Sequence, residues 1–271
     1  MNTRPIGVFD SGLGGLTAMH TLGKRLPNET FIYFGDTARV PYGGRSEATL
    51  LKYARQDVAF LKSFKPKVLV IACGTVSTTC LEQLQQENSL PIIGVVEPTC
   101  LQALHATKNG RIGMIATQAS VRSGAYERML HRLDPDVDVF CHPCPLLVPM
   151  VENGRMHRGD IVIETLVKEY LAPLKAKGID TLMLGCTHYP LLWDVIGKEM
   201  GPSVTLISAG AAVATAVETL LEDSHMEAPQ TSDSHRSFYV SDEVESFTRN
   251  ASLFLQEDLH QVVRRIDIDQ Y

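Results

Sequence analysis

Blocks of apolar residues alternate with short polar turns along this chain, and their lengths predict strands that alternate with helices. The clearest block is a buried strand predicted at 181–184, after which the chain turns polar with Cys186, Thr187 and His188. Pro190 then opens a run with helical spacing, and proline is favoured in the first turn of a helix. A thiol, a hydroxyl and an imidazole are thus predicted at a strand end, where ligands bind to open α/β sheets.

A second stretch, residues 67–75, has the same construction. An apolar strand leads to Cys73 and then to a polar turn. The next helix is expected near Thr79 and Glu82, because these two residues have the spacing of a capping box. Cys73 and Cys186 therefore occupy equivalent places in two similar units.

The order of strands and turns repeats along the chain. A second strand begins 21 residues after Asp10 and 20 residues after Thr117, and a cysteine follows these two residues by 63 and 69 positions. A further strand begins 18 residues after each cysteine. We interpret this as a duplicated α/β unit: two pseudo-symmetric, doubly wound parallel-sheet domains with the active site in the cleft between them.

The rest of the chain follows the same patterning. Strands are predicted at 5–9, 31–34, 67–72, 91–96, 111–117, 137–140, 204–207, 238–240 and 261–268, and helices at 16–26, 46–64, 99–107, 211–221 and 243–255. Residues 223–237 are polar and predict a surface loop. The tail has no counterpart in the repeat and is expected to pack on the first half, which gives domains 1–97 plus 208–271, and 98–207.

Composition narrows the class of protein. The chain has 271 residues, of which 44% are hydrophobic, so a well-buried core is expected. A net charge of −6 with scattered lysines and arginines argues against nucleic acid as a partner. No stretch is long and apolar enough for a membrane span, and no signal-peptide core precedes the first strand. We therefore expect a cytoplasmic protein, whose six cysteines are reduced rather than paired.

The matched cysteines carry the chemistry that we consider first. A cysteine after an apolar strand is often only a small buried hydrophobe. Two thiols on opposite faces of a small substrate, however, suit a two-base exchange in which one thiolate removes a proton from carbon and the other thiol delivers one. At a pKa of ~8.5 little thiolate exists at pH 7. Each cysteine precedes a predicted helix, whose N-terminus is expected to lower the thiol pKa.

Asp10 and His188 each have two interpretations. Asp10 lies between a strand and a glycine-rich turn, so it can cap a helix or accept a proton from Cys73 or an ammonium group. His188 can be structural or solvated, or it can hold a proton near neutral pH and pair with a thiolate or a carboxylate. The spacing alone leaves both choices open.

Two further motifs do not support a cofactor. Residues 10–15 are glycine-rich but match neither G-x-G-x-x-G nor a Walker loop, although their N–H groups can cradle a carboxylate. Cys141 and Cys144 form a C-x-x-C without a second pair for zinc. The prolines at 145 and 149 are expected to resist the helix that a thioredoxin-like motif opens.

Five stretches together resemble a known family. They are Ile6–Thr17, Tyr33–Gly43, Gly94–Pro98, Cys144–Glu152 and Leu184–Leu192. Their motifs are similar to those of the glutamate racemases, in the cofactor-independent aspartate/glutamate racemase family. The similarity spans residues 6 to about 215, and the Gly-Cys-Thr-His-Tyr-Pro and Asp-Thr-Ala-Arg-Val-Pro-Tyr-Gly stretches are its most specific parts.

The resemblance implies interconversion of L- and D-glutamate for peptidoglycan synthesis by a homodimer, without pyridoxal phosphate, metal or nucleotide. It makes Cys73 and Cys186 the proton donors and acceptors, assisted by Asp10 and His188. The residues it implies for substrate binding or support are Ser11, Tyr42, Gly43, Gly74, Thr75, Thr117, Glu152 and Thr187.

Two positions depart from the family pattern. Gly74 stands where many members have asparagine, so contact with substrate there is limited to backbone or water. Ser208 stands at a strand-to-helix turn where aspartate is common. Alternatives to the glutamate reaction are racemisation of aspartate or another acidic amino acid, a hydrolase that uses Cys186 and His188 with Cys73 dispensable, and a binding module without turnover.

Overall fold

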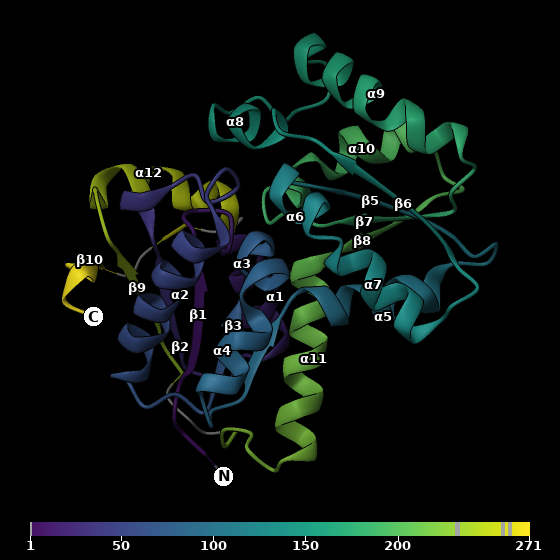
Figure 1. The fold of residues 1–271 in the computed structure, drawn as a ribbon. Coiled ribbons are helices and arrows are strands. Elements are labelled where there is room, and N and C mark those ends of the chain that lie inside the picture. The colour runs from purple at the N-terminus through teal and green to yellow at the C-terminus, as the bar shows by residue number, and fades with distance from the viewer. Residues whose placement is uncertain (1, 231–233, 256–257, 260–261) are drawn as a thin grey trace.

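The computed structural model describes residues 2–230, 234–255, 258–259 and 262–271. Within these residues the chain forms two parallel sheets flanked by helices (Figure 1). The first sheet has the strand order β10-β9-β2-β1-β3-β4 and the second has the order β6-β5-β7-β8. The strands are β1 (Ile6–Asp10), β2 (Phe31–Gly35), β3 (Val68–Ile71), β4 (Ile92–Gly94), β5 (Arg111–Ala116), β6 (Asp138–Pro143), β7 (Thr181–Leu184), β8 (Thr205–Ser208), β9 (Arg236–Val240) and β10 (Val263–Arg265).

The strand order confirms the predicted duplication and the α/β fold class. The order β2-β1-β3-β4 in the first sheet is matched by β6-β5-β7-β8 in the second, and every neighbouring pair is parallel. β3 ends at Ile71 and β7 ends at Leu184, each two residues before a cysteine. The two thiols therefore follow equivalent strand ends.

Helices connect the strands and cover the sheets (Figure 1). They are α1 (Leu16–Arg25), α2 (Glu47–Lys62), α3 (Gly74–Thr79), α4 (Leu81–Glu87), α5 (Val96–Ala106), α6 (Gln118–Ser123), α7 (Ala125–Leu133), α8 (Leu147–Glu152), α9 (Ile161–Ala176), α10 (Trp193–Met200), α11 (Ala209–Asp223) and α12 (Val244–Leu255), with short 3-10 turns at Thr37–Arg39, Tyr189–Leu192 and Ile268–Gln270. In the described part of the chain, none of the helices has the length and apolarity to cross a bilayer.

Prolines explain two differences from the predicted elements. The strand expected at 91–96 stops at Gly94 and α5 begins at Val96, with Pro98 in its first turn. In the same way, α8 begins at Leu147 with Pro149 in its first turn, so the prediction that this stretch resists a helix is wrong. The missing N–H of proline has no intrahelical partner in the first turn, so proline costs little there.

The helix starts around the first cysteine also differ from expectation. The capping box predicted at Thr79 and Glu82 is absent from the described contacts, because the Thr79 hydroxyl donates instead to the carbonyl of Thr75 at 2.8 Å. α3 begins directly after Cys73, and α4 follows at Leu81. This back-bond within the helix competes with capping.

The tail returns to the first sheet, as predicted. β9 pairs with β2, and β10 pairs with β9. The last strand was expected from Gln261, which lies outside the described residues, and β10 covers only Val263–Arg265. The loop predicted at 223–237 has narrower bounds in the structure. The helix before it, α11, extends to Asp223, and the strand after it, β9, begins at Arg236.

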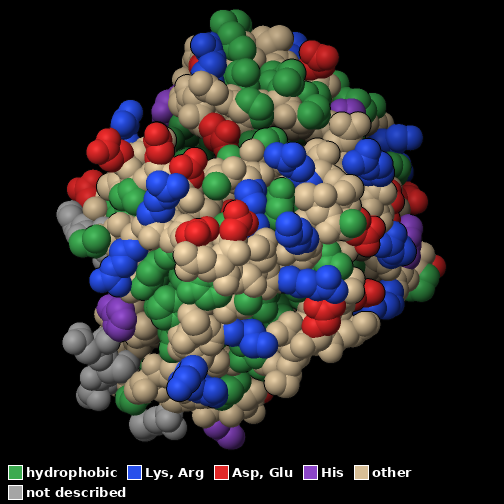
Figure 2. Space-filling model, turned by 60° about the vertical axis from the view of Figure 1, so that its left-hand side comes forward, with side chains coloured by type: hydrophobic (Ala, Val, Ile, Leu, Met, Phe, Trp, Pro, Cys, Tyr) green, Lys and Arg blue, Asp and Glu red, His purple; other side chains and the backbone are tan. Residues whose placement is uncertain are grey.

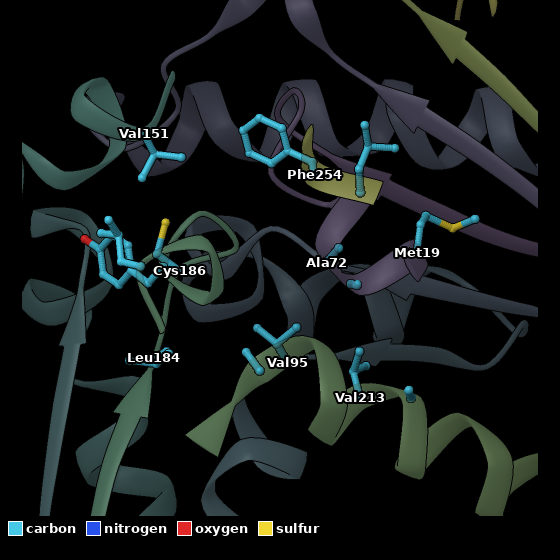
Figure 3. Packing of buried hydrophobic residues seen from close by; sticks show 14 of the residues in the cluster. Met19, Ala72, Val95, Val151, Leu184, Cys186, Val213 and Phe254 are labelled. Carbon is cyan, nitrogen blue, oxygen red and sulfur yellow. The ribbon is translucent and has the colours of Figure 1, made fainter. Parts of the chain in front are cut away.

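One hydrophobic cluster crosses from the first sheet to the second. Figure 3 shows part of it, with Val95, Val213, Leu184, Cys186 and Phe254 of α12 in the same cluster. The tail thus shares its core with both halves. The outer surface is mixed in charge: on the face in Figure 2, basic and acidic side chains are interspersed.

A buried ion pair ties the segment after α11 to the first sheet. The Lys67 ammonium and Glu29 Oε2 are 2.5 Å apart, and their side chains are 0% and 4% exposed. Lys67 Nζ also donates to the carbonyls of Asn2 at 2.8 Å and Met226 at 2.7 Å. Glu29 Oε1 accepts the N–H of Ala228 at 2.8 Å. Both charges are therefore compensated inside the protein.

We predict that Glu29→Gln lowers the free energy of unfolding by about 3–5 kcal/mol, because it leaves the Lys67 ammonium buried and uncompensated. Urea unfolding measures the change. The control is Glu164→Gln, which removes the partner of Lys198 in an exposed pair (side chains 26% and 53% exposed) and should cost less than about 1 kcal/mol. Equal losses in the two variants would contradict the prediction.

Candidate active site

A cavity of about 410 Å³ opens at the carboxyl ends of strands from both sheets. It lies where the sequence predicted a ligand site, beyond β1 and β3 of the first half and β5 and β7 of the second. All twelve predicted site residues line it: Asp10, Ser11, Tyr42, Gly43, Cys73, Gly74, Thr75, Thr117, Glu152, Cys186, Thr187 and His188. The structure therefore brings together every residue singled out from the sequence, while their roles in chemistry remain predictions.

The two cysteines have equivalent backbone positions but different polar neighbours. Both are buried, with Cys73 4% and Cys186 7% exposed. Cys73 Sγ lies 3.8 Å from Ser11 Oγ. Cys186 Sγ lies 3.9 Å from Nδ1 of His188. The duplicated fold thus presents two thiols to one cavity, each in its own electrostatic setting.

The N-terminus of α3 lowers the pKa of Cys73 as expected, through the Val76 N–H, but the net shift is in the opposite direction. Burial raises its pKa, and the neighbouring Asp10 carboxylate raises it further, against the opposing effects of the Val76 N–H and Ser11. For Cys186 the expected geometry is absent, because the next helical turn begins only at Tyr189 and is 3-10. The folded protein therefore favours the thiol form of Cys73.

Asp10 combines the two interpretations that the sequence left open. Its Oδ2 accepts the N–H groups of Gly15 at 2.9 Å and Gly12 at 3.2 Å, which shapes the turn before α1. Its buried Oδ1 has no hydrogen-bond partner among the described residues. Burial raises the pKa of Asp10, although His188 and these N–H groups oppose the rise. One oxygen thus builds the loop and the other is left for a ligand.

His188 forms a buried chain between a carboxylate and a thiol. Its Nε2 is 3.0 Å from Glu152 Oε1, and its Nδ1 faces both Cys186 and Thr187. Burial alone would lower the pKa of His188, but its interactions with Cys186 and Glu152 outweigh that effect and raise the pKa to about 10. The imidazole is therefore protonated at neutral pH, and it places positive charge beside Cys186.

Hydroxyl groups join the two halves of the cavity. The Thr75 and Thr117 hydroxyl oxygens, one from each half, are 3.3 Å apart. Across the same boundary, the hydroxyl of Thr17 in α1 donates to the carbonyl of Thr187 at 2.8 Å. Thr117 also caps α6 by accepting the N–H of Ser120. These contacts set the spacing of the cavity walls.

Tyr42 lies in the cavity wall, but its hydroxyl is engaged elsewhere. The hydroxyl donates to Asp36 and lies 3.2 Å from Asp57 Oδ2. Arg39 binds both carboxylates, with Nε 2.6 Å from Asp36 and Nη2 3.0 Å from Asp57. Tyr42 therefore offers a ligand its backbone or its ring. The sequence placed Asp36 in a motif and Asp57 in a predicted helix, without indicating this network.

At Gly74 the backbones of the two halves approach each other closely. A Cβ at this position would lie 2.6 Å from the carbonyl oxygen of Gly185, which is closer than real Cβ atoms approach. A side chain of any size is therefore incompatible with this packing. Ser208 is the other position that departs from the family pattern. Its hydroxyl accepts the N–H of Ala211 and caps α11, a role that aspartate can also fill.

Sequence reasoning missed several lining residues. They are Val40, Pro41, Gly44, Gln118, Cys144, Pro145, Val148, Pro149 and Gly185. Most lie within the quoted motifs, but their side chains suggested no role in chemistry. Cys144 was considered in a C-x-x-C and as part of the stretch Cys144–Glu152. In the described part of the chain, no group of three or more His, Cys, Asp and Glu side chains could hold a metal ion.

Comparisons with known proteins agree with this geometry. The Asp/Glu/Hydantoin racemase family matches residues 22–217. The chain is 41% identical to a glutamate racemase of Geobacter metallireducens over 262 residues, 97% of this chain and 96% of the relative. Its fold is similar to a glutamate racemase isoform of Bacillus anthracis (TM-score 0.94, 38% identity, 98% of both chains). It is also similar to the Francisella tularensis glutamate racemase in complex with D-glutamate (TM-score 0.91, 36% identity, 100% of both chains).

We predict that Glu152→Gln lowers the pKa of His188 from about 10 by roughly one unit or more, because it removes the carboxylate that stabilises the imidazolium. Histidine ¹³Cε1 shifts measured by NMR across pH follow this titration, and a His188→Asn spectrum assigns the signal. The exposed Glu169→Gln in α9 is the control and should leave the titration in place. An unchanged midpoint in Glu152→Gln would refute the coupling.

We predict that Gly74→Ala destabilises the fold by about 1–3 kcal/mol, because its Cβ forces the Gly185 carbonyl away. The matched control is Gly44→Ala in the same cavity wall, where a Cβ meets nothing within 4 Å. Urea unfolding compares the two variants. If Gly74→Ala is as stable as Gly44→Ala, the close approach of the two halves does not constrain residue 74.

Proposed function

The chain belongs to the Asp/Glu/Hydantoin racemase family, and from its active site we propose that it interconverts L- and D-glutamate. The observation that carries this proposal is the pair of thiols, Cys73 and Cys186, at equivalent strand ends in one cavity. The relatives compared above are glutamate racemases, and one of them is in complex with D-glutamate. The proposed enzyme is an amino-acid racemase that needs no added cofactor.

The reaction exchanges the proton on the α-carbon. With one enantiomer, the first thiolate removes the α-proton, the electron pair stays on the substrate carbon, and the opposite thiol protonates the other face. The enzyme then holds its thiol and thiolate in reversed positions, ready for the other enantiomer. Asp10 assists Cys73, and His188 with Glu152 assists Cys186. The imidazolium of His188 lies beside Cys186, with Nδ1 3.9 Å from the sulfur atom.

The substrate supplies the charge that Cys73 lacks. Its ammonium group is placed at the free oxygen of Asp10, where it offsets the carboxylate that raises the pKa of Cys73. Among the described lining residues none is lysine or arginine, so N–H groups and hydroxyls hold the two carboxylates. The residues assigned to this binding are Ser11, Tyr42, Gly43, Gly74, Thr75, Thr117 and Thr187, with Gly74 acting through its backbone.

Four wider features are part of the proposal. D-glutamate formed here supplies peptidoglycan synthesis, the enzyme is a homodimer, and it acts in the cytoplasm, which suits its six free cysteines. The domains are 1–97 plus 208–271, and 98–207. This division is supported by the sheets, because β1–β4, β9 and β10 form one and β5–β8 form the other.

The direct test is to incubate the purified protein with L-glutamate in D₂O without added cofactor. Deuterium at the α-position and formation of D-glutamate, followed by NMR and chiral analysis, are the expected results. Exchange with aspartate but not with glutamate would change the substrate and keep the mechanism. No exchange with any acidic amino acid would refute the proposal and favour a hydrolase or a binding protein.

We predict that Cys73→Ser and Cys186→Ser each lower racemisation by roughly 10²–10⁴-fold, because each removes one of two acid–base groups. Turnover measured from both enantiomers checks this, and Cys141→Ser, outside the cavity lining, is the control. A Cys-dependent hydrolase built on Cys186 and His188 would leave Cys73 dispensable. Near-normal turnover by Cys73→Ser would therefore rule out the two-base reaction.

A further inference from the structure

The tail of the chain reaches the active site at His188. Phe254, near the end of α12, packs its ring against the His188 imidazole, with ring centroids 5.4 Å apart and planes at 87°. Phe254 is 1% exposed and His188 is 6% exposed, so this contact is sealed from water. In Figure 3 the Phe254 ring lies between the end of α12 and the side chains of Val151 and Cys186.

The polar contacts of His188 leave its ring incompletely held. Its shortest polar contact is with Glu152, whose side chain is 44% exposed, so solvent and side-chain motion weaken that restraint. Its Nδ1 lies at 3.4 Å from the Thr187 hydroxyl and at 3.9 Å from Cys186 Sγ, which are long distances for hydrogen bonds. The buried Phe254 therefore supplies a rigid apolar contact on the imidazole.

We propose that Phe254 is a positioning residue that holds the imidazole of His188 with Nδ1 toward Cys186 and Nε2 toward Glu152. This inference rests on the proposed racemase function. Phe254 acts through His188, which serves Cys186, whereas Cys73 is served by Asp10 and Ser11. The tail thus supports one of the two proton transfers and leaves the other to the repeated fold.

Because of this asymmetry, the isotope effects for the two enantiomers can distinguish a positioning role from a purely structural one. If loss of Phe254 slows proton transfer at Cys186, that step becomes more rate-limiting. The isotope effect of an α-deuterated substrate then rises for the enantiomer that Cys186 deprotonates and falls for the opposite enantiomer, whose proton leaves to Cys73. General destabilisation lowers the amount of active enzyme and leaves both isotope effects unchanged.

The test is Phe254→Leu, which keeps an apolar side chain and removes the flat ring. We expect kcat to fall by roughly 10-fold, since small misplacements of a catalytic group are costly, with KM changing little. Cys186→Ser identifies the enantiomer whose isotope effect should rise. The matched control is Phe60→Leu in α2, which is equally buried at 2% exposure and packs on Phe34, Phe64, Tyr239 and Tyr271 instead.

The possible results distinguish the positioning role of Phe254 from the racemase function itself. Opposite shifts of the two isotope effects in Phe254→Leu, with none in Phe60→Leu, support the proposal. Unchanged isotope effects in an active Phe254→Leu enzyme overturn it. If this variant fails to fold, the same isotope effects are measured in Phe254→Met, which has an unbranched side chain without a ring. Absence of racemisation in the unaltered protein would instead mean that the proposed function has failed.

Discussion

The close approach of two backbones underlies the active site. At Gly74 the first half of the chain comes so near the carbonyl of Gly185 that no Cβ fits between them. Because these glycines adjoin Cys73 and Cys186, the contact brings the two strand ends into one cavity. The hydroxyl pair of Thr75 and Thr117 crosses the same boundary. Parallel sheets supply the strand ends, but this contact determines how far apart their side chains are.

Burial makes the chemistry depend on the substrate. Burial and Asp10 raise the pKa of Cys73, so the protein favours its thiol form. In the proposed reaction, the ammonium group of the substrate lies at Asp10 and opposes this effect. His188, whose pKa is raised to about 10, places a permanent positive charge beside Cys186. The two cysteines therefore carry out their proton transfers next to different charges: Asp10 beside Cys73, and His188 beside Cys186.

Much of this could be predicted from the sequence, because strand patterning and turn position are local properties. The duplication and four of the twelve lining residues, Cys73, Cys186, Asp10 and His188, could be predicted from spacing. The family resemblance implied the other eight. The starts of α5 and α8 were missed, because Pro98 and Pro149 lie in first turns, where proline is tolerated. The pKa of Cys73 was misjudged because burial is a property of the whole fold.

The contacts with the active site that are hardest to predict come from segments without a motif. A repeat with two identical halves would treat both thiols alike, yet the tail contacts each half differently. Phe254 packs on His188, and the Ser241 hydroxyl donates to Asp36 at 2.8 Å in the network that holds Tyr42. Neither contact leaves a signature in the sequence, since each joins residues more than 60 positions apart. The tail thus breaks the symmetry of the duplicated unit, and it does so where two thiols must carry out opposite tasks.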